Sequence, residues 1–436
     1  MTKQKIAVFW FRRDLRLVDN AGLFNALKSG LPVLPVFIFD KNILQKLSAG
    51  NDARVSFIHT EILKINNELV KNGSSLKVIH DNPLGAFHKL TEEYDIEAVY
   101  TNRDYEPYAT QRDSEIGAFL KQKGINFNTF KDHIIFEHNE VLKDDGTPYT
   151  VFTPYSNKWK LKLGNTEIPE FPSQNYIGGF MKTEPLKIHT LQELGFEQSK
   201  IKVPDYNISE DLIKNYAEKR DLPAFDATSK LGVHLRFGTI SIRQATQNAI
   251  KYSEIFLNEL IWRNFFSSIL SHFPYVEKSA FKPKYDLIEW RNNEKEFELW
   301  CLGKTGYPLV DAGMRELNET GFMHNRVRMV TASFLTKHLL IDWRWGEAYF
   351  AEKLLDFDLA SNNGNWQWAA GSGCDAAPYF RVFNPEAQQK KFDGKAEYIL
   401  KWLPEYGTVQ YPKPIVEHKF ARERVLKAYK SALEKS

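Results

Sequence analysis

Residues 226–232, Asp-Ala-Thr-Ser-Lys-Leu-Gly, place two hydroxyl groups and one ammonium group directly before an apolar, helix-like pattern. Asp, Thr and Ser are favoured at helix N-caps, so a capping segment is one interpretation. The same hydroxyls, with free N–H groups and Lys230 at the positive end of a helix, are also suited to hold phosphate oxygens. The segment alone leaves both interpretations open.

A second polar group lies inside a later apolar, helix-like pattern. Glu259 shares a helix face with Trp262 and Arg263, which follow it by three and four residues. Most such Glu–Arg pairs are solvated, but the neighbouring Leu, Ile and Phe residues argue against a fully exposed face. Asp356 and Asp358 also have two interpretations, as helix-end carboxylates or as partners of a ribose or a ring nitrogen.

Residues 356–385 form the most unusual stretch of the chain. They read DFDLASNNGNWQWAAGSGCDAAPYFRVFNP, which joins adjacent asparagines, two closely spaced tryptophans and a Gly-Ser-Gly turn. Asn362 and Asn363 need hydrogen-bond partners if they are buried, so packing alone does not explain this mixture. The first strand is not followed by G-x-G-x-x-G, and the Walker and H-E-x-x-H patterns are missing. This argues against a nicotinamide dinucleotide site, a P-loop and a metalloprotease.

The whole chain has 436 residues, of which 43% are hydrophobic and 26% charged, with a net charge of +3. These values are typical of a soluble protein with two or three domains. Two cysteines are too few for a disulfide framework or a multi-cysteine metal site. No segment reaches the roughly 20 apolar residues that span a bilayer. We therefore expect a cytoplasmic monomer with no metal, no membrane segment and no obligate protein partner.

The elements that must position these residues differ between the two halves of the chain. Apolar runs predict strands at residues 6–11, 33–39, 76–80, 98–101 and 126–130. Amphipathic segments predict helices at residues 22–29, 53–71, 83–94 and 108–123. This alternation is typical of an α/β domain with a doubly wound, Rossmann-like parallel sheet, which we place at residues 1–131.

Residues 132–204 lack a lasting periodicity and predict an irregular connector. From residue 205 to residue 436 apolar residues recur at helical spacing, which predicts an all-helical domain. Its clearest helices are expected at residues 209–220, 242–251, 255–271, 327–340 and 345–355.

A series of long motifs gives nearly the whole chain a resemblance to one known family. They are FWFRRDLRLVDN at residues 9–20, NELIWRNFF at 258–266, GKTGYPLVDAGMREL at 303–317, GFMHNRVRMVTASFL at 321–335 and the stretch at 358–385. The chain resembles the photolyase/cryptochrome flavoproteins, and within them the class I cyclobutane pyrimidine dimer photolyases. The resemblance implies an antenna-type α/β domain and a helical domain that binds FAD. It also implies a lyase that uses light and reduced FADH⁻ to split pyrimidine dimers in DNA.

The resemblance assigns one set of residues to FAD. The residues implied around the phosphates and ribityl chain are Tyr216, Thr228, Ser229, Lys230, Leu231 and Gly232, and those implied around the flavin are Arg263, Arg328, Asp356, Asp358 and Asn362. Relatives usually carry serine at the position of Gly232. Asn362 corresponds to the residue that faces flavin N5, where we expect an amide to donate to the anionic reduced flavin without titrating.

A second set is implied for damaged DNA. Glu259 and Asn325 are expected to hydrogen-bond the bases, with apolar contacts from Trp262, Met329 and Trp368 to a dimer flipped out of the duplex. Arg220, Arg326 and Arg381 correspond to residues that contact DNA phosphates, which would explain DNA binding at a net charge of only +3. His324 is turned away from Asn325 on a helix and is expected to be a packed or capping residue.

Three tryptophans, Trp366, Trp343 and Trp290, correspond to the chain that photoreduces oxidised flavin in the family. The loop at residues 102–108 lacks the Asn-Glu pair of folate binders. The antenna pocket therefore stays open to a deazaflavin, a folate, another flavin or no chromophore. Three alternative functions also stay open: a cryptochrome-type photoreceptor, a (6-4) photoproduct photolyase and a flavin-bearing DNA binder without catalysis.

Overall fold

The structure is a computed structural model, and it describes residues 4–376 and 378–435. The chain forms two compact units. The first comprises residues 1–140, 160–206 and 230–248, and the second comprises residues 141–159, 207–229 and 249–436. Helices α6 (Phe152–Gly164) and α9 (Ile242–Tyr252) contribute residues to both.

The first unit is built on a parallel sheet with strand order β3-β2-β1-β4-β5. Its strands are β1 (Lys5–Phe11), β2 (Val33–Asp40), β3 (Lys77–Asp81), β4 (Asp95–Asn102) and β5 (Asn126–Phe130). Its helices are α1 (Ala21–Leu27), α2 (Lys41–Leu44), α3 (Ala53–Lys71), α4 (Pro83–Glu93), α5 (Pro107–Gln122) and α8 (Leu231–Phe237). The strand order confirms the predicted doubly wound α/β domain.

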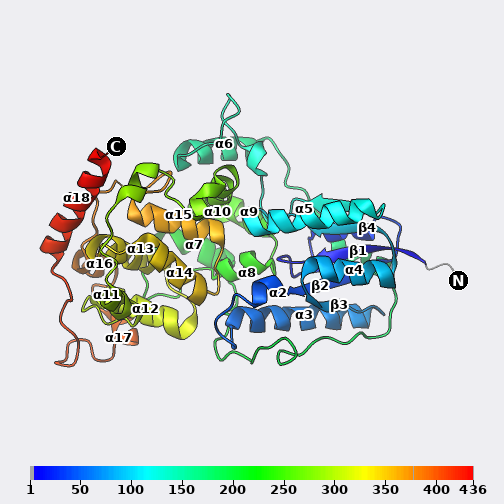
Figure 1. The fold of residues 1–436 in the computed structure, drawn as a ribbon, viewed down its shortest axis with the longest axis horizontal. Coiled ribbons are helices and arrows are strands. Elements are labelled where there is room, and N and C mark those ends of the chain that lie inside the picture. The colour runs from blue at the N-terminus through cyan, green and yellow to red at the C-terminus, as the bar shows by residue number, and fades with distance from the viewer. Residues whose placement is uncertain (1–3, 377, 436) are drawn as a thin grey trace. The chain divides into compact units, whose positions relative to one another are not determined.

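Both faces of the sheet are covered (Figure 1). Phe9 and Phe11 of β1 pack against residues of α1 and α3, whereas Val8 and Trp10 pack against residues of α4 and α5. Alternate side chains of a strand point to opposite faces, so a strand buried on both must be apolar throughout. This explains why β1 reads as an uninterrupted apolar run.

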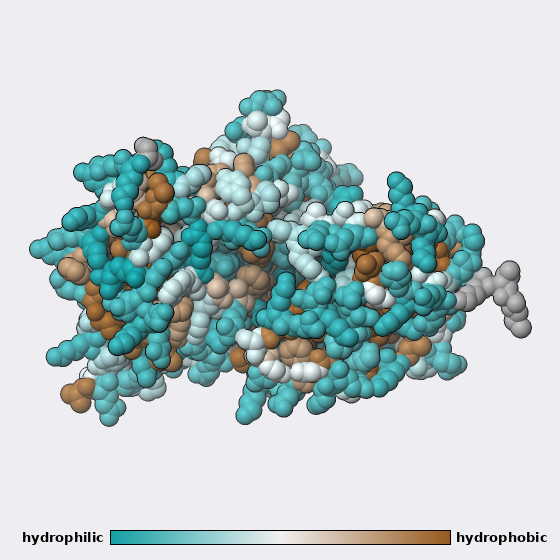
Figure 2. All heavy atoms as spheres, in the orientation of Figure 1, coloured by the Kyte–Doolittle hydropathy of each residue, from teal (hydrophilic) through white to brown (hydrophobic). Residues whose placement is uncertain are grey.

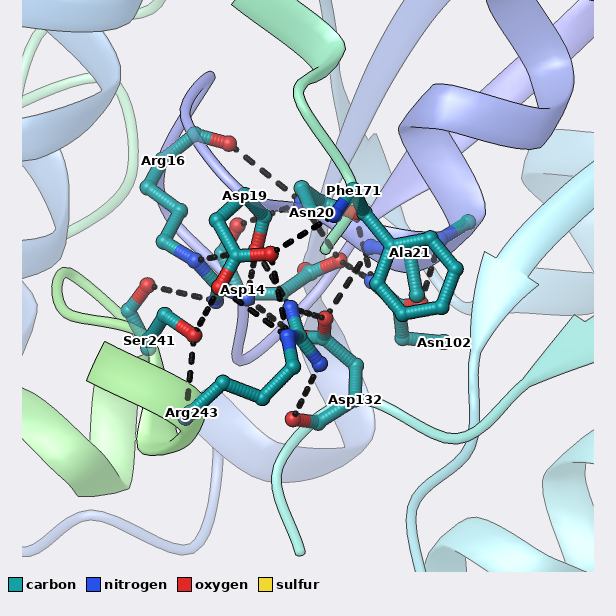
Figure 3. Close-up of polar contacts among 12 residues, drawn as sticks. Asp14, Arg16, Asp19, Asn20, Ala21, Asn102, Asp132, Phe171, Ser241 and Arg243 are labelled. Carbon is teal, nitrogen blue, oxygen red and sulfur yellow. Dashed lines mark hydrogen bonds and ion pairs between the residues drawn. The ribbon is translucent and has the colours of Figure 1, made fainter. Parts of the chain in front are cut away.

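A buried network of charged residues holds the loop after β1 in the first unit (Figure 3). Asp132 accepts from Arg16 at 2.7 Å and from Arg243 at 2.9 Å, and Arg243 also donates to Asp19 at 2.9 Å. Burial by itself raises the pKa of Asp132, but the two arginines lower this pKa well below its ordinary value. Arg243 belongs to α9, so the network fixes residues 230–248 to the α/β domain.

The second unit is helical. Its helices are α7 (Glu210–Lys219), α10 (Glu254–His272), α11 (Glu294–Cys301), α12 (Pro308–Thr320), α13 (Asn325–Ser333), α14 (Trp343–Lys353), α15 (Leu359–Ala370), α16 (Pro385–Phe392), α17 (Glu397–Trp402) and α18 (His418–Glu434). Its core is formed mainly by α12, α13, α14 and α15. The prediction that the C-terminal region is helical is confirmed, although residues 230–248, which the prediction assigned to this domain, belong to the first unit.

Two glycines let helix α15 lie close to its neighbours. A Cβ atom on Gly346 of α14 would lie 2.1 Å from the ring of Trp366. A Cβ atom on Gly364 of α15 would lie 2.2 Å from the ring of Phe266 in α10. Helix α15, which carries the Asn-Asn and Trp-x-Trp pairs, is therefore held tightly between α10 and α14.

Two sequence predictions differ from the structure. The helix predicted at residues 327–340 ends as α13 at Ser333 and continues as a π-helical turn, Phe334–His338, before Leu340 takes a left-handed φ of 53°. The predicted connector contains helix α6, whose buried face is limited to the aromatic and small residues Tyr155, Ser156 and Trp159. So narrow a stripe is a weak periodic signal.

No helix among the described residues is both long and apolar enough to cross a membrane. The face of the molecule drawn in Figure 2 is mostly hydrophilic, with apolar side chains in small separate groups. Scattered exposed apolar residues of this kind are normal on protein surfaces.

Candidate active site

Asn362 is held by a residue that sequence reasoning missed. Asp358 caps α15 by accepting from the Ser361 backbone N–H at 3.1 Å, and Asn362 follows one turn later, 8% exposed. The side-chain amide of Asn362 donates to Glu347 of α14 twice, to its backbone oxygen at 3.1 Å and to its carboxylate at 2.7 Å. Both amide hydrogens are therefore committed to Glu347.

This arrangement changes the role expected for Asn362. The group left to face a ligand is the side-chain carbonyl oxygen of Asn362, which accepts a hydrogen bond. This differs from the amide donor that the sequence predicts. Burial raises the pKa of Glu347, the bond from Asn362 opposes this, and Glu277 raises it further. No pattern in the sequence singled out Glu347, because the contact joins residues 15 positions apart on two helices.

Arg328 and Asp356 form a two-pronged ion pair. The guanidinium of Arg328 donates to both carboxylate oxygens of Asp356, at 3.1 and 3.0 Å, and to the backbone oxygen of Met323 at 2.6 Å. Planar pairing of this kind fixes the orientation of both side chains. Asp356 is therefore an ion-pair partner, and Asp358 has the helix-end role that the sequence left open.

The segment at residues 226–232 starts a helix, as predicted, but its cap is different. Helix α8 begins at Leu231, and the N-cap residue is Lys230, in a left-handed conformation with φ of 55° and no side-chain capping bond. Gly232 is the second, exposed residue of α8. Of the two interpretations that the sequence left open, the structure therefore does not place Asp226, Thr228 or Ser229 at the N-cap position.

Several buried polar atoms of the second unit lack a hydrogen-bond partner among the described residues. Two of them belong to the region assigned to FAD or lie next to it: Oγ1 of Thr228, and Oδ1 of Asn258 on α10. Buried polar atoms without partners are rare in folded proteins and call for a missing ligand or water. Ribityl hydroxyls, which both donate and accept, fit both atoms, and a phosphate oxygen fits the Thr228 hydroxyl as an acceptor. The predicted FAD residue Tyr216 lies on α7 with its ring 5.0 Å from Phe256, and Arg263 lies on α10.

The residues expected to contact DNA lie in the second unit. Glu259 of α10 pairs with Arg220, and burial raises the pKa of Glu259 although Arg220 opposes the shift. Arg326 pairs with Asp221 at 2.8 Å. Arg381 is exposed, and no side-chain partner is seen for it within residues 4–376 and 378–435. Of the three arginines expected to bind phosphate, two already have a carboxylate partner.

Asn325 and Met329, which have no titratable side chain, form one face of helix α13. Its first residue, Asn325, is exposed and its amide approaches the sulfur of Met329 at 4.0 Å, which confirms that the two share a face. His324 is 3% exposed and caps the helix, since its Nδ1 accepts from the Arg326 backbone N–H at 3.2 Å. The expected capping role of His324 is confirmed.

Four tryptophans of the predicted site line or border the core of the second unit. Trp366 and Trp343 are each 2% exposed, whereas Trp290 is half-buried and lies edge-on to Tyr429 at 6.0 Å between ring centroids. Trp368 is half-buried at the border of the same core. Exposure therefore rises from Trp366 and Trp343 to Trp290.

Comparisons with known proteins show the family to which the chain belongs. Residues 7–173 match the family described as DNA photolyase, and residues 256–410 match the FAD-binding domain of DNA photolyase. The deoxyribodipyrimidine photo-lyase of Synechococcus sp. is 35% identical over 98% of this chain and 96% of its own length. The chain therefore belongs to the DNA photolyase family, and its helical unit carries the FAD-binding domain of that family.

Two solved structures are similar over nearly the whole chain. A bacterial class III photolyase from Agrobacterium tumefaciens superposes with a TM-score of 0.87 and 34% identity, covering 100% of this chain and 99% of that one. An archaeal photolyase from Sulfolobus tokodaii with two FAD molecules has a TM-score of 0.84 and 35% identity, covering 98% and 99%. The expected class I assignment stays a prediction.

Proposed function

We propose that the protein is a light-driven DNA repair enzyme that splits cyclobutane pyrimidine dimers. The observation that carries this proposal is the face of α13, where Asn325 and Met329 lie together while His324 is committed to capping. Ring opening of a cyclobutane dimer needs an electron but no proton from the protein. A face without a titratable group suits that reaction.

Reduced FAD, held by residues of the helical unit, would supply the light-driven electron that opens the cyclobutane ring. The chain's own residues bind and orient. The amide of Asn362, fixed by Glu347, offers an acceptor to the flavin, and Thr228 and Asn258 offer unpaired polar atoms to the rest of the cofactor. Arg328 and Asp356 hold each other in place beside α15.

Damaged DNA is proposed to bind the second unit. Arg381, Arg326 and Arg220 would contact phosphates, while Glu259 and Asn325 would bond the base edges of the flipped dimer. This proposal is supported by the exposure of Asn325 and Arg381 and by the half-buried positions of the other three residues. Because Arg220 is paired with Glu259, DNA phosphates would also release this carboxylate for the bases.

The proposal is tested by incubating the FAD-loaded, reduced protein with an oligonucleotide that carries one thymine dimer, in light and in darkness. Chromatography of the product should show restored thymines in light only. A dimer that stays intact in light, while flavin bands confirm the loaded cofactor, would contradict the repair function and leave the photoreceptor or the non-catalytic binder.

We further infer that Trp290, Trp343 and Trp366 pass electrons to oxidised flavin. The rise in exposure toward Trp290 supports this direction, since the outermost residue must meet a reductant in solution. Trp343→Phe should slow photoreduction and leave dimer repair unchanged once the flavin is reduced chemically. Equal photoreduction rates in variant and wild type would remove Trp343 from the path.

A second chromophore is proposed for the α/β unit, as in the family. The loop at residues 102–108 contributes to a dense set of polar contacts, in which Asp104 pairs with Arg13 and Tyr105 donates to Glu137. A deazaflavin, a folate or a second flavin each stays open. An absorption spectrum of the purified protein decides among them, because each of these chromophores absorbs at its own wavelengths, and flavin bands alone at one FAD per chain would contradict a second chromophore.

A further inference from the structure

Trp262, which is proposed to pack against the dimer, has an aromatic partner that none of the site motifs includes. Phe152 lies flat on the indole of Trp262, with ring centroids 3.6 Å apart and planes 3° apart. Aromatic pairs left to themselves prefer offset or edge-to-face geometry at 4.5–7 Å. So close and parallel a stack must be imposed by the surroundings of the two rings.

The packing of α6 against α10 imposes the stack of Phe152 on Trp262. Phe152, Tyr155 and Trp159 recur at helical spacing along one face of α6. Tyr155 packs on Phe265 at 5.1 Å, and the indole N–H of Trp159 donates to Asn264 at 3.1 Å. This stripe seats α6 on α10, and Phe152 is its first residue.

Phe152 is also fixed from a third segment. Its backbone N–H donates to the carboxylate of Asp375 at 3.0 Å. Asp375 lies six residues before Arg381, the exposed arginine expected to contact a DNA phosphate. Trp262 itself is enclosed on other sides by Phe266 at 5.3 Å and Phe265 at 5.6 Å.

We propose that Phe152 is a positioning residue for lesion recognition, because it fixes the plane of Trp262 before the dimer arrives. The proposal rests on the function proposed above and on the contact of Trp262 with the dimer that the family resemblance implies. An indole of Trp262 that is already ordered loses less side-chain freedom when the dimer binds. This favours binding of the flipped dimer and does not affect contacts with the DNA backbone. Phe152 thereby contributes to selectivity for damaged over undamaged DNA.

The test measures binding in darkness by the FAD-loaded protein to matched duplexes with and without a thymine dimer. Phe152→Leu keeps an apolar side chain but removes the flat ring. We expect about three- to tenfold weaker binding to the dimer and unchanged binding to the undamaged duplex, as for the loss of one ordered side chain. Phe152→Tyr, which keeps a flat aromatic ring, should have the selectivity of the wild type.

A matched control separates this role from the docking of α6. Tyr155 lies on the same face of α6, and among the described contacts its ring packs on Phe265 and not on Trp262. Tyr155→Leu should therefore lower the melting temperature and leave selectivity unchanged. Asp375→Ala, which keeps every ring, should reduce selectivity in the same direction as Phe152→Leu. If Phe152→Leu and Tyr155→Leu reduce selectivity equally, Phe152 has only a structural role and the inference is overturned.

Trp262→Leu distinguishes failure of this inference from failure of the proposed function. Loss of selectivity in Trp262→Leu but not in Phe152→Leu or Asp375→Ala would overturn the role of Phe152 and leave the function intact. Unchanged selectivity in Trp262→Leu would show that Trp262 does not contact the lesion. It would also overturn the positioning role of Phe152, which depends on that contact. When both roles hold, Phe152→Leu adds nothing to Trp262→Leu in the double variant.

Discussion

One set of arginine–carboxylate pairs in each unit differs from the other in its exposure and in its partners. In the α/β unit, Arg16, Arg243 and Asp132 have side chains only 8%, 5% and 1% exposed, and each is bonded to further members of a closed network. In the helical unit, Arg220 and Glu259 are 25% and 33% exposed and have each other as partners. A closed network stabilises one conformation, whereas an open pair can exchange a partner for a ligand.

The charge balance of the two sets follows the same division. Arg16 pairs with Asp132, and Arg243 pairs with both Asp132 and Asp19, so two carboxylates balance the two arginines. Arg326 and Asp221 form a single pair in which Asp221 is 40% exposed. A DNA phosphate can therefore replace the carboxylate without leaving it buried and unpaired. We therefore propose that an exposed carboxylate partner distinguishes the arginines that bind DNA phosphates from those of the closed network.

Breaking the closed network should give the largest effect. Asp132→Asn leaves Arg16 and Arg243 buried without their shared charge, and we expect the α/β unit to lose about 3–5 kcal/mol of stability. The control is Asp81→Asn, which breaks an ion pair with an exposed lysine, Lys89, and should cost within about 1 kcal/mol. Denaturant unfolding followed by circular dichroism measures both, and equal losses would contradict the comparison.

The same carboxylate gives a pH dependence with a defined sign. The pKa of Asp132 is lower in the folded protein than its ordinary value of 3.8. Its contribution to stability is therefore complete above about pH 4 and is lost as the pH falls through the lowered pKa. Wild-type protein should lose its stability advantage over Asp132→Asn only in this acid range. A constant difference between the two at every pH would contradict the assignment.

An effect of intermediate size is expected from Asn362→Asp. The substitution places a carboxylate against the carboxylate of Glu347, at the position of a 2.7 Å contact, and beside the flavin. Negative charge there disfavours the anionic reduced flavin, so FAD should be retained but its reduced form should reoxidise faster, roughly tenfold or more. The reoxidation rate is measured from the flavin absorbance when air is admitted after anaerobic reduction. Unchanged reoxidation and wild-type repair would remove Asn362 from the flavin site.

The smallest effects sharpen the comparison among the open arginines. Arg381→Ala should weaken binding to damaged and undamaged duplex alike, on the order of fivefold, and reduce the salt slope by about one phosphate contact. Arg326→Ala should weaken binding less, because Arg326 must first leave Asp221. Fluorescence anisotropy at several salt concentrations measures both. A loss confined to damaged DNA would mean that the arginine contacts the lesion instead.

Strands and helices of the α/β unit were predictable because full burial and helical spacing leave strong patterns. The start of β4 was missed, since Asp95 and Glu97 alternate with buried Ile96 and Ala98 there, and the charges hide the strand. The motifs placed Asn362, Asn325 and Trp262, but their partners Glu347, Phe152 and Asp375 come from distant segments. Such partners follow from packing between helices, which no local pattern encodes.

The lesion that the enzyme repairs tests the central claim most directly. The reduced protein is illuminated with two oligonucleotides, one with a cyclobutane thymine dimer and one with a (6-4) photoproduct, and both are followed by chromatography. With Asn325 and Met329 on the open face of α13 and His324 committed to its cap, we predict turnover of the cyclobutane dimer and none of the (6-4) photoproduct. Comparable turnover of the (6-4) photoproduct would contradict the account.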